Sequence, residues 1–362
     1  MEKYLMKKNI LTFCLTGSLI ISTLSVGAQT PSGKPTQEAP KSHSLTSLPD
    51  FIQPEPIQFK GEGVSLSGTL FLPKNKVGQK IPAIVMISDF YSHQDGIKVY
   101  KGQHNSYLDL AKHFVQRGFA VLRYDRRCTG ESECALNATL AVAADDGLGA
   151  VSYLTERKEI DATKIFVFGH GDGSFIATGI AGHKPVAGVI TTVAPGRTAS
   201  KLLREWARQR VADLKMPEAE AAKYVETVDA AILRLAAGGA KPEELNIDPK
   251  DDLLFPLLKS TDYAYSWLLD DPLALYPLVR GSVLVIHGGK DRRVNPRDGN
   301  FIRDSLKTGE HKDYQTVVLP DMDYFLKENK GTPGFESDND VSRPLDPALL
   351  KLIDEWLAKR IR

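Results

Sequence analysis

The sequence predicts an α/β fold in which helices cover a mostly parallel, doubly wound sheet, and three observations support that class. Short, almost continuously apolar runs such as Ile81–Ser88 and Phe119–Tyr124 are typical of strands buried on both faces. They alternate with helical patterns such as Tyr107–Arg117, which carries its apolar residues on one face and ends before Gly118. With 362 residues, 42% of them hydrophobic and 25% charged, the chain suits one such domain with an insertion, or two small domains.

The first 28 residues have the pattern of a secretory signal peptide. Three lysines near the start precede the mostly apolar run Ile10–Leu24, and Val26–Ala28 offers small residues before a cleavage site. An uncleaved membrane anchor is the alternative, but the apolar run is shorter than the roughly 20 residues that a membrane span needs. We therefore expect an exported protein, periplasmic or secreted, with no membrane span once residues 1–28 are removed.

Residues 29–56 are rich in Pro, Ser, Thr and Lys and lack apolar periodicity, which predicts a flexible linker. The folded domain is then expected to span residues 57–362. Its first segments, Ile57–Lys60 and Val64–Leu72, alternate apolar and polar residues around a Gly-Glu-Gly turn. This pattern predicts an antiparallel hairpin at the edge of the sheet.

The later elements are predicted from the same two patterns, apolar runs for strands and apolar stripes for helices. They are a helix over Val142–Glu156, a short turn over Asp161–Lys164, strands from Ile165 and over Val186–Val193, Ser282–His287 and Tyr314–Leu319, and a closing helix over Pro347–Ile361. Between the strands at 186–193 and 282–287 lies a long segment with two amphipathic helical patterns. Residues 197–275 are therefore expected to form an inserted helical lid over the carboxyl ends of the strands, the alternative being a structural appendage.

Charge and cysteine content restrict the partners. The formal net charge is +1, so the electrostatic attraction that dominates nucleic-acid binding has no evident source, and we expect no nucleic-acid partner. After removal of the signal peptide only Cys128 and Cys134 remain, and an oxidising compartment would favour a disulfide between them over two reduced thiols. Two cysteines without clustered histidines do not make a metal site, and the sequence indicates no cofactor.

The segment Ile165–Phe175 turns sharply from a strand into a helix through closely spaced glycines. Its Gly-His-Gly-Asp-Gly-Ser resembles the Gly-His-Ser-Glu-Gly-Gly nucleophile elbow of secreted bacterial α/β-hydrolases, the esterase-like group near the serine aminopeptidase and dienelactone hydrolase families. A glycine-rich turn is by itself common in α/β proteins. In this alignment Gly171 stands at the position of the nucleophile, while Ser174 lies three residues further on, inside the first turn of the helix.

Two further motifs carry the same resemblance. The loop Asp125–Ser132 is similar to the Tyr-Asp-Arg-Arg-Gly-x-Gly-x-Ser loop of these hydrolases, with Cys128 in place of the first glycine. Gly-Gly-Lys-Asp, ending at Asp291, resembles the turn that carries the acid of the catalytic triad. The run after the last strand, which relatives end with the histidine base, here ends with Tyr324. The resemblance implies an α/β-hydrolase fold over about residues 57–361 in which Asp291 is the only triad-type residue kept.

The expected oxyanion region also departs from the family pattern. Where relatives carry a Gly-Ser-Gly-Pro-like stretch, this chain has Asp89, Phe90 and Tyr91, so a carboxylate lies near the place where negative charge would develop. Asp172 matches the residue after the nucleophile, whose backbone N–H is an oxyanion donor in relatives. A phenol with a pKa near 10 is a poor proton acceptor at neutral pH, so Tyr324 cannot simply replace a histidine.

These replacements lead to three hypotheses about function. The first is an exported α/β-hydrolase-family protein that has lost hydrolytic chemistry and keeps a pocket under the lid for a small-molecule or peptide ligand or a partner. The second is an active carboxylic-ester or peptide hydrolase with a rearranged site. The third is a structural or interaction protein that uses the lid as an interface. The sequence does not determine the oligomeric state.

Overall fold

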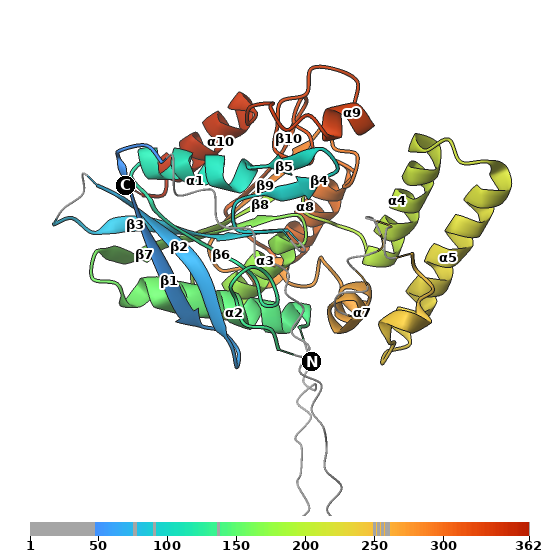
Figure 1. Ribbon diagram of the computed structural model, residues 1–362. Coiled ribbons are helices and arrows are strands. Elements are labelled where there is room, and N and C mark those ends of the chain that lie inside the picture. The colour runs from blue at the N-terminus through green and yellow to red at the C-terminus, as the bar shows by residue number, and fades with distance from the viewer. Residues whose placement is uncertain are drawn as a thin grey trace, which may run out of the picture. The chain divides into compact units, whose positions relative to one another are not determined.

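The computed structural model describes residues 48–74, 78–89, 92–135, 138–248, 251, 254, 257 and 261–361. The predicted signal peptide and residues 29–47 of the predicted linker lie outside this part of the chain. An eight-stranded sheet has the order β1-β2-β6-β3-β7-β8-β9-β10, as Figure 1 shows. Its strands are β1 Ile52–Lys60, β2 Ser65–Pro73, β3 Ile81–Ile87, β6 Ala120–Tyr124, β7 Ile160–His170, β8 Gly188–Thr192, β9 Ser282–Gly288 and β10 Tyr314–Leu319.

Most strand pairs in this sheet are parallel. Only β1 with β2 and β2 with β6 are antiparallel, whereas the pairs from β6 and β3 through to β10 are parallel. The predicted fold class is therefore confirmed. Because the strands from β3 to β10 run the same way, their carboxyl ends lie along one edge of the sheet, where open α/β sheets bind ligands.

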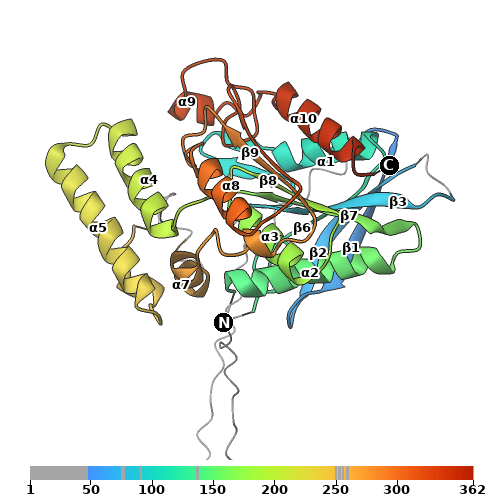
Figure 2. The same cartoon turned by 180° about the vertical axis from the view of Figure 1, so that it is seen from behind.

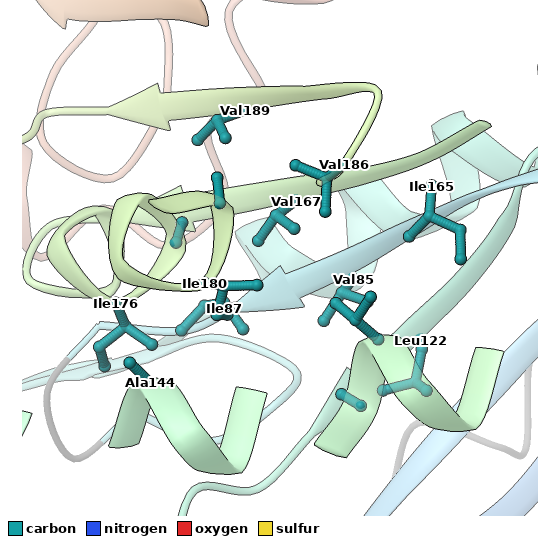
Figure 3. Packing of buried hydrophobic residues seen from close by; sticks show 14 of the residues in the cluster. Val85, Ile87, Leu122, Ala144, Ile165, Val167, Ile176, Ile180, Val186 and Val189 are labelled. Atoms are coloured by element: carbon teal, nitrogen blue, oxygen red, sulfur yellow. The ribbon is translucent and has the colours of Figure 1, made fainter. Parts of the chain in front are cut away.

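Helices cover both faces of the sheet. They are α1 Ser106–Gln116, α2 Leu140–Glu156, α3 Gly173–His183, α8 Asp298–Thr308 and α10 Pro347–Ala358. One apolar cluster includes Ala150 of α2, Ile180 of α3 and Ile302 of α8, and the other includes Phe114 of α1 and Trp356 of α10. Figure 2 shows α1 and α10 on one side of the sheet and α2 on the other. Figure 3 shows Ile176 and Ile180 packed in the first cluster, beside residues of the sheet.

The first strand begins earlier than predicted. β1 starts at Ile52, inside the expected linker 29–56, and contains Pro54 and Pro56. Proline cannot donate a backbone hydrogen bond, so it is tolerated in a sheet mainly on an edge strand. β1 is such an edge strand, and the two prolines are two residues apart, so both lack their N–H on the same side of the strand. That side faces away from β2.

The turn predicted at Asp161–Lys164 is part of strand β7. The strand runs from Ile160 to His170, and its pairing with β3 shifts register between Ile81 and Ala83. An irregularity of this kind allows polar residues within a strand to point away from the apolar layers. The sequence pattern of Asp, Thr and Lys therefore marks an irregular strand start.

The segment between β8 and β9 folds as a group of helices with its own apolar core. It contains α4 Ala199–Asp213, α5 Glu218–Ala236, η2 Pro242–Glu244, α7 Thr261–Leu269 and η3 Tyr276–Leu278. Leu203, Ile232 and Leu268 belong to a third cluster that is separate from the two beside the sheet. The two amphipathic patterns of the sequence correspond to α4 and α5, which lie side by side in both views (Figures 1 and 2).

Several small elements have no counterpart in the sequence prediction. They are the two-stranded sheet of β4 Ile97–Val99 and β5 Gly102–His104, the helix α8 already given, and the single turn α9 Phe335–Asp338. Cys128 and Cys134 are joined by a disulfide. Cys128 has a φ of 61°, the left-handed conformation that the glycine of the related loop would supply. Among the described helices, none combines the length and the apolar character needed to cross a membrane.

Candidate active site

The turn after β7 depends on its glycines. Gly171 has a φ of 57°, and its N–H donates to the carbonyl of Thr192 on the neighbouring strand at 3.0 Å. A Cβ on Gly173 would lie 2.6 Å from the carbonyl oxygen of Ile87, and one on Gly169 would overlap the backbone of Gly173. The turn can therefore pass this close to β3 and to α3 only because these positions lack side chains.

The side chain of Asp89 occupies the space in front of Gly171. A Cβ on Gly171 would overlap Oδ1 of Asp89 and would lie 2.8 Å from the hydroxyl of Tyr324. Oδ1 of Asp89 accepts a hydrogen bond of 3.2 Å from the backbone N–H of Asp172. Oδ2 accepts from the hydroxyl of Tyr324. The structure thus brings together the positions expected for the nucleophile, the base and the oxyanion donor, and a carboxylate lies between them.

Tyr324 acts here as a hydrogen-bond donor. It lies in the loop after β10 with only 6% of its surface exposed. Burial, and next the carboxylate of Asp89, raise the pKa of its phenol well above the ordinary value of 10. The hydroxyl therefore keeps its proton at neutral pH and donates a hydrogen bond to Asp89. A general base would instead accept a proton.

The carboxylate of Asp172 points away from its own backbone N–H, into a buried polar group. It contacts Nη1 of Arg126 at 3.2 Å and accepts a hydrogen bond from the hydroxyl of Tyr263. The guanidinium of Arg126 also lies over the ring of Tyr263, 5.0 Å from its centre. Burial raises the pKa of Asp172 to about 7, and the Arg126 charge acts in the opposite direction. Tyr263 comes from α7, and no spacing in the sequence indicated this contact.

Asp291, the expected triad acid, lies in the turn after β9. Its Oδ1 accepts from the backbone N–H groups of Arg293 at 2.7 Å and Val294 at 2.9 Å. Its Oδ2 is buried without a hydrogen-bond partner in the described part of the chain. Burial raises the pKa of this carboxyl to about 8. No hydrogen bond joins Asp291 to Tyr324 among the described residues. The position expected for the acid is therefore not linked to the position expected for the base.

The other candidate catalytic side chains are engaged elsewhere. Oγ of Ser174 is buried and donates to the carbonyl of Gly169 at 3.0 Å. Nδ1 of His170 lies 3.0 Å from Oγ1 of Thr192, and burial lowers the pKa of this histidine to about 3. Burial likewise lowers the pKa of His287 to about 4. Both imidazoles are therefore neutral core groups at physiological pH. Phe90 and Tyr91, expected beside the oxyanion donor, lie outside the described residues.

A cavity of about 270 Å³ opens in front of Asp89 and Gly171. One wall comes from the sheet edge and the other from the inserted helices, where Trp206 and Trp267 stack with ring centres 5.9 Å apart. The described lining residues are Asp89, Gly171, Asp172, Pro195, Leu203, Trp206, Gln209, Arg210, Asp213, Leu214, Leu257, Trp267, Arg292, Arg293, Val294, Tyr324, Phe335 and Asp338. No serine, threonine, cysteine, histidine or lysine belongs to this set.

The described residues also offer no metal site. Nowhere in the described ranges do three or more His, Cys, Asp or Glu side chains gather in a way that could hold a metal ion. The polar groups of the cavity are mainly carboxylates and guanidinium groups, with the amide of Gln209 and the hydroxyl of Tyr324, and they suit recognition of a polar organic ligand.

Comparison with known proteins places the chain in a family. A family model described as X-Pro dipeptidyl-peptidase (S15 family) matches residues 62–297. Esterase EstD of Thermotoga maritima is 25% identical over 290 residues, which cover 79% of this chain and 65% of that protein. An uncharacterized protein, PA2218 of Pseudomonas aeruginosa, is 27% identical over 183 residues, 49% of this chain and 46% of the relative. The chain spans less than two thirds of the length of these curated relatives.

Solved structures agree on the fold. The structure of PA2218 from Pseudomonas aeruginosa has a TM-score of 0.56 at 16% identity and covers 90% of this chain and 98% of that one. The α/β-hydrolase GrgF from Penicillium sp. sh18 has a TM-score of 0.54 at 17% identity and covers 85% of this chain and 99% of that one. The resemblance inferred from the elbow and loop motifs is confirmed. The chain belongs to the X-Pro dipeptidyl-peptidase (S15) family and has the α/β-hydrolase fold.

Proposed function

We propose that this protein is a non-hydrolytic member of its family that uses the cavity beneath the inserted helices to bind a small molecule or peptide. One observation carries the proposal: the carboxylate of Asp89 fills the space in front of Gly171 and accepts from both the Asp172 N–H and the Tyr324 hydroxyl. A substrate carbonyl would have to displace this carboxylate to reach the same donor.

Acyl transfer needs a nucleophile, a base that takes its proton, and free donors for the oxyanion. The nucleophile position is a glycine, and the only hydroxyl among the described lining residues belongs to Tyr324, which keeps its proton. In subtilisin, the loss of the serine or the histidine alone lowers kcat by about 10⁶. Here both are replaced and the donor is already occupied, so hydrolysis through this arrangement has no support.

The cavity itself supports a binding role. It combines a wall of large apolar side chains with a few charged groups, which is the composition of small-molecule sites. Its volume of about 270 Å³ lies just below the roughly 300–1,000 Å³ typical of such sites, which suits a small ligand. The inserted helices that form one wall pack through a core of their own, so the wall is well formed.

The test is hydrolysis of a panel of activated short-chain esters and of X-Pro peptide amides by the purified protein. We expect background rates, equal in the wild type, Asp89→Asn and Asp291→Ala, because no side chain of the site is placed to attack. Turnover by the wild type that disappears in Asp89→Asn or Asp291→Ala would overturn the proposal and assign a rearranged hydrolase. Loss of a protein partner on changing exposed lid residues such as Leu233, with no small-molecule binding, would assign an interface role instead.

We also propose that the protein works in an oxidising compartment outside the cytoplasm. Two observations support this: the signal-like segment at residues 1–28, and the disulfide between Cys128 and Cys134.

A further inference from the structure

We infer that the ligand of the cavity is an organic anion whose carboxylate is held by Arg293 and whose aromatic or similarly apolar body lies against Trp206 and Trp267. This inference rests on the proposed binding function and names the chemical class of its ligand. It depends on three features: the charge pairing of the cavity arginines, the position of the Arg293 guanidinium, and the apolar wall attached to it.

Three arginines line the cavity, and two of them are held by carboxylates of the protein. Arg292 donates to Asp213 at 2.6 Å and to Asp338 at 2.9 Å. Arg210 lies 3.8 Å from Asp251. Within the described ranges, the guanidinium of Arg293 makes neither an ion pair nor a hydrogen bond. Its charge acts on the carboxyls of Asp291 and Asp338 without a direct ion pair to either, so its N–H donors remain available to an anion from outside.

Aromatic rings hold the Arg293 side chain in place. Its guanidinium carbon lies 4.6 Å from the ring centre of Tyr324 and 4.9 Å from that of Phe325. Stacking of this kind fixes the plane of the group while its N–H edge stays free, so less conformational entropy is lost when a planar carboxylate binds. Burial and the Asp89 carboxylate raise the pKa of Tyr324, and the charge of Arg293 opposes them, so the guanidinium lies close enough to act on this phenol.

The Asp89 carboxylate also lies at the floor of the cavity but forms no ion pair with Arg293 among the described residues. Its two oxygens already accept from Asp172 N–H and from the Tyr324 hydroxyl. Tyr324 lies between the two charges, since its ring contacts Arg293 and its hydroxyl contacts Asp89. Arg293 is therefore the charged group with unused hydrogen-bonding capacity toward the cavity, and a carboxylate is the group that fits its paired N–H donors.

The apolar wall is attached to the same residue. Nε1 of Trp206 donates to the backbone carbonyl of Arg293 at 2.6 Å, so the indole N–H is satisfied and its ring faces can meet an apolar ligand. Trp267 stacks on Trp206 and also lines the cavity, as do Leu203 and Leu257. A ligand anchored by its carboxylate on Arg293 would thus extend along an aromatic surface.

The experiment uses three probes of similar size and different charge: 3-phenylpropanoate, its planar neutral analogue 3-phenylpropanamide, and 3-phenylpropylammonium. Binding to the full-length protein is measured by calorimetry and by the shift in Tm. We expect 3-phenylpropanoate to bind at least tenfold more tightly than the other two. Arg293→Gln should remove this preference and Arg293→Lys should keep part of it. Arg303→Gln, on an exposed arginine of α8 paired with Asp304, should leave binding unchanged.

The outcomes separate this inference from the proposed function. Equal or tighter binding of the amide or the ammonium probe, or a preference that survives in a folded Arg293→Gln variant, would overturn the carboxylate inference while leaving a binding role intact. Absence of binding by all three probes would also overturn it. Ester turnover measured on the same preparations would instead contradict the non-hydrolytic function. A Trp267→Leu variant should weaken 3-phenylpropanoate without changing the order of the three probes.

Discussion

Asp89, Gly171 and Tyr324 depend on one another at the level of single atoms. The carboxylate of Asp89 lies where a side chain at position 171 would begin, and Tyr324 donates its hydroxyl to that carboxylate. A glycine is needed at 171 for two separate reasons, its φ of 57° and the lack of space. Shortening Asp89 removes most of the overlap and leaves only the Tyr324 hydroxyl, the end of a side chain, near the added Cβ, so positions 89 and 171 should be energetically coupled.

This coupling gives a first prediction. We expect Gly171→Ala to lower the free energy of unfolding by about 2–4 kcal/mol, because it adds both backbone strain and overlap. In an Asp89→Gly background the cost should fall to about 1 kcal/mol. Gly63→Ala is the matched control, since Gly63 has a φ of 70° but nothing within 4 Å of the added Cβ. Chemical denaturation of the four variants measures the cycle, and additive costs would contradict the arrangement described.

The buried carboxyl of Asp291 predicts a pH dependence of stability. Its pKa is raised from 3.8 to about 8. Between these two pH values the folded protein therefore holds a proton on Asp291 that the unfolded chain has released. The stability from this group is complete below about pH 4 and is lost as the pH rises to about 8, at up to about 1.4 kcal/mol per pH unit. Asp172, raised to about 7, acts in the same direction.

We therefore expect the difference in Tm between Asp291→Asn and the wild type to become more favourable to the variant as pH rises from 5 to 8. Thermal denaturation across this range is the measurement. Asp304→Asn, at an exposed carboxylate, serves as the control and should follow the wild type. Parallel curves for Asp291→Asn and the wild type would mean that Asp291 is ionised throughout.

Sequence motifs predicted some residues of the candidate site, and there is a physical reason why they did not predict the others. Gly171, Tyr324 and Asp291 follow strands whose ends meet at one edge of the sheet, so local pattern was sufficient to find them. Asp89 was recognised as a carboxylate near the oxyanion region, but its contacts with Gly171 and Tyr324 join positions far apart in the chain. Arg293 and Trp206 become a site only through packing of the inserted helices, which no spacing encodes.

At the scale of elements, one arginine connects the inserted helices to the body of the domain. Arg292, in the turn after β9, donates to Asp213 at the end of α4 and to Asp338 at the end of α9. Exposed apolar side chains lie next to both ends, Leu214 and Phe335, and both line the cavity. The charged link therefore holds α4 against the rim of the cavity without an extensive apolar contact at that point.

We expect Arg292→Ala to loosen this rim while the fold is kept. Backbone amides of the last turn of α4 and of α9 should exchange with solvent at least tenfold faster, and those of β7 and β8 should be unchanged. Hydrogen–deuterium exchange read by mass spectrometry measures both. Arg303→Ala on α8 is the control. Unchanged exchange in α4 would mean that the apolar core of the insertion alone holds the helix.

Elements with long apolar patterns were predicted with nearly their observed bounds, whereas the edge strand β1 and the shortest elements were not. β9 extends only one residue beyond its predicted end, because a parallel strand inside the sheet needs a continuous apolar run. β10 has the predicted bounds although it is an edge strand, since its aromatic and β-branched residues favour a strand. β1 was placed too late, since its prolines resemble a linker until the edge position is known. The single turn α9 and the short β4–β5 pair are too small to produce a periodic pattern.

At the scale of the whole molecule, the fold separates structural stability from the cavity. The two large apolar clusters lie on either face of the sheet and the third lies within the insertion. The disulfide closes the loop Cys128–Cys134, whose cysteines belong to none of the three clusters, although Ala135 beside Cys134 packs against the first. A disulfide across a loop of this length stabilises the folded state because it reduces the conformational entropy of the unfolded chain.

We expect the pair of changes Cys128→Ser and Cys134→Ser to lower the free energy of unfolding by about 2 kcal/mol, with a matching shift under reducing conditions in the wild type only.

If the protein is exported, alkylation of thiols in intact cells should find both cysteines protected, and the protein should fractionate outside the cytoplasm without residues 1–28. Recovery in the cytoplasm with two free thiols would contradict the proposed compartment.

The carboxylate in front of Gly171 also limits how this family member could change over time. A change to serine at 171 alone would meet Asp89 and the Tyr324 hydroxyl, and would destabilise the fold. A mutation to histidine at 324 alone would gain no nucleophile to activate. A change at position 89 would first have to remove this overlap, and on the proposed non-hydrolytic function that step alone would bring no hydrolysis. The position of the Asp89 carboxylate thus disfavours any single substitution that adds a side chain at position 171.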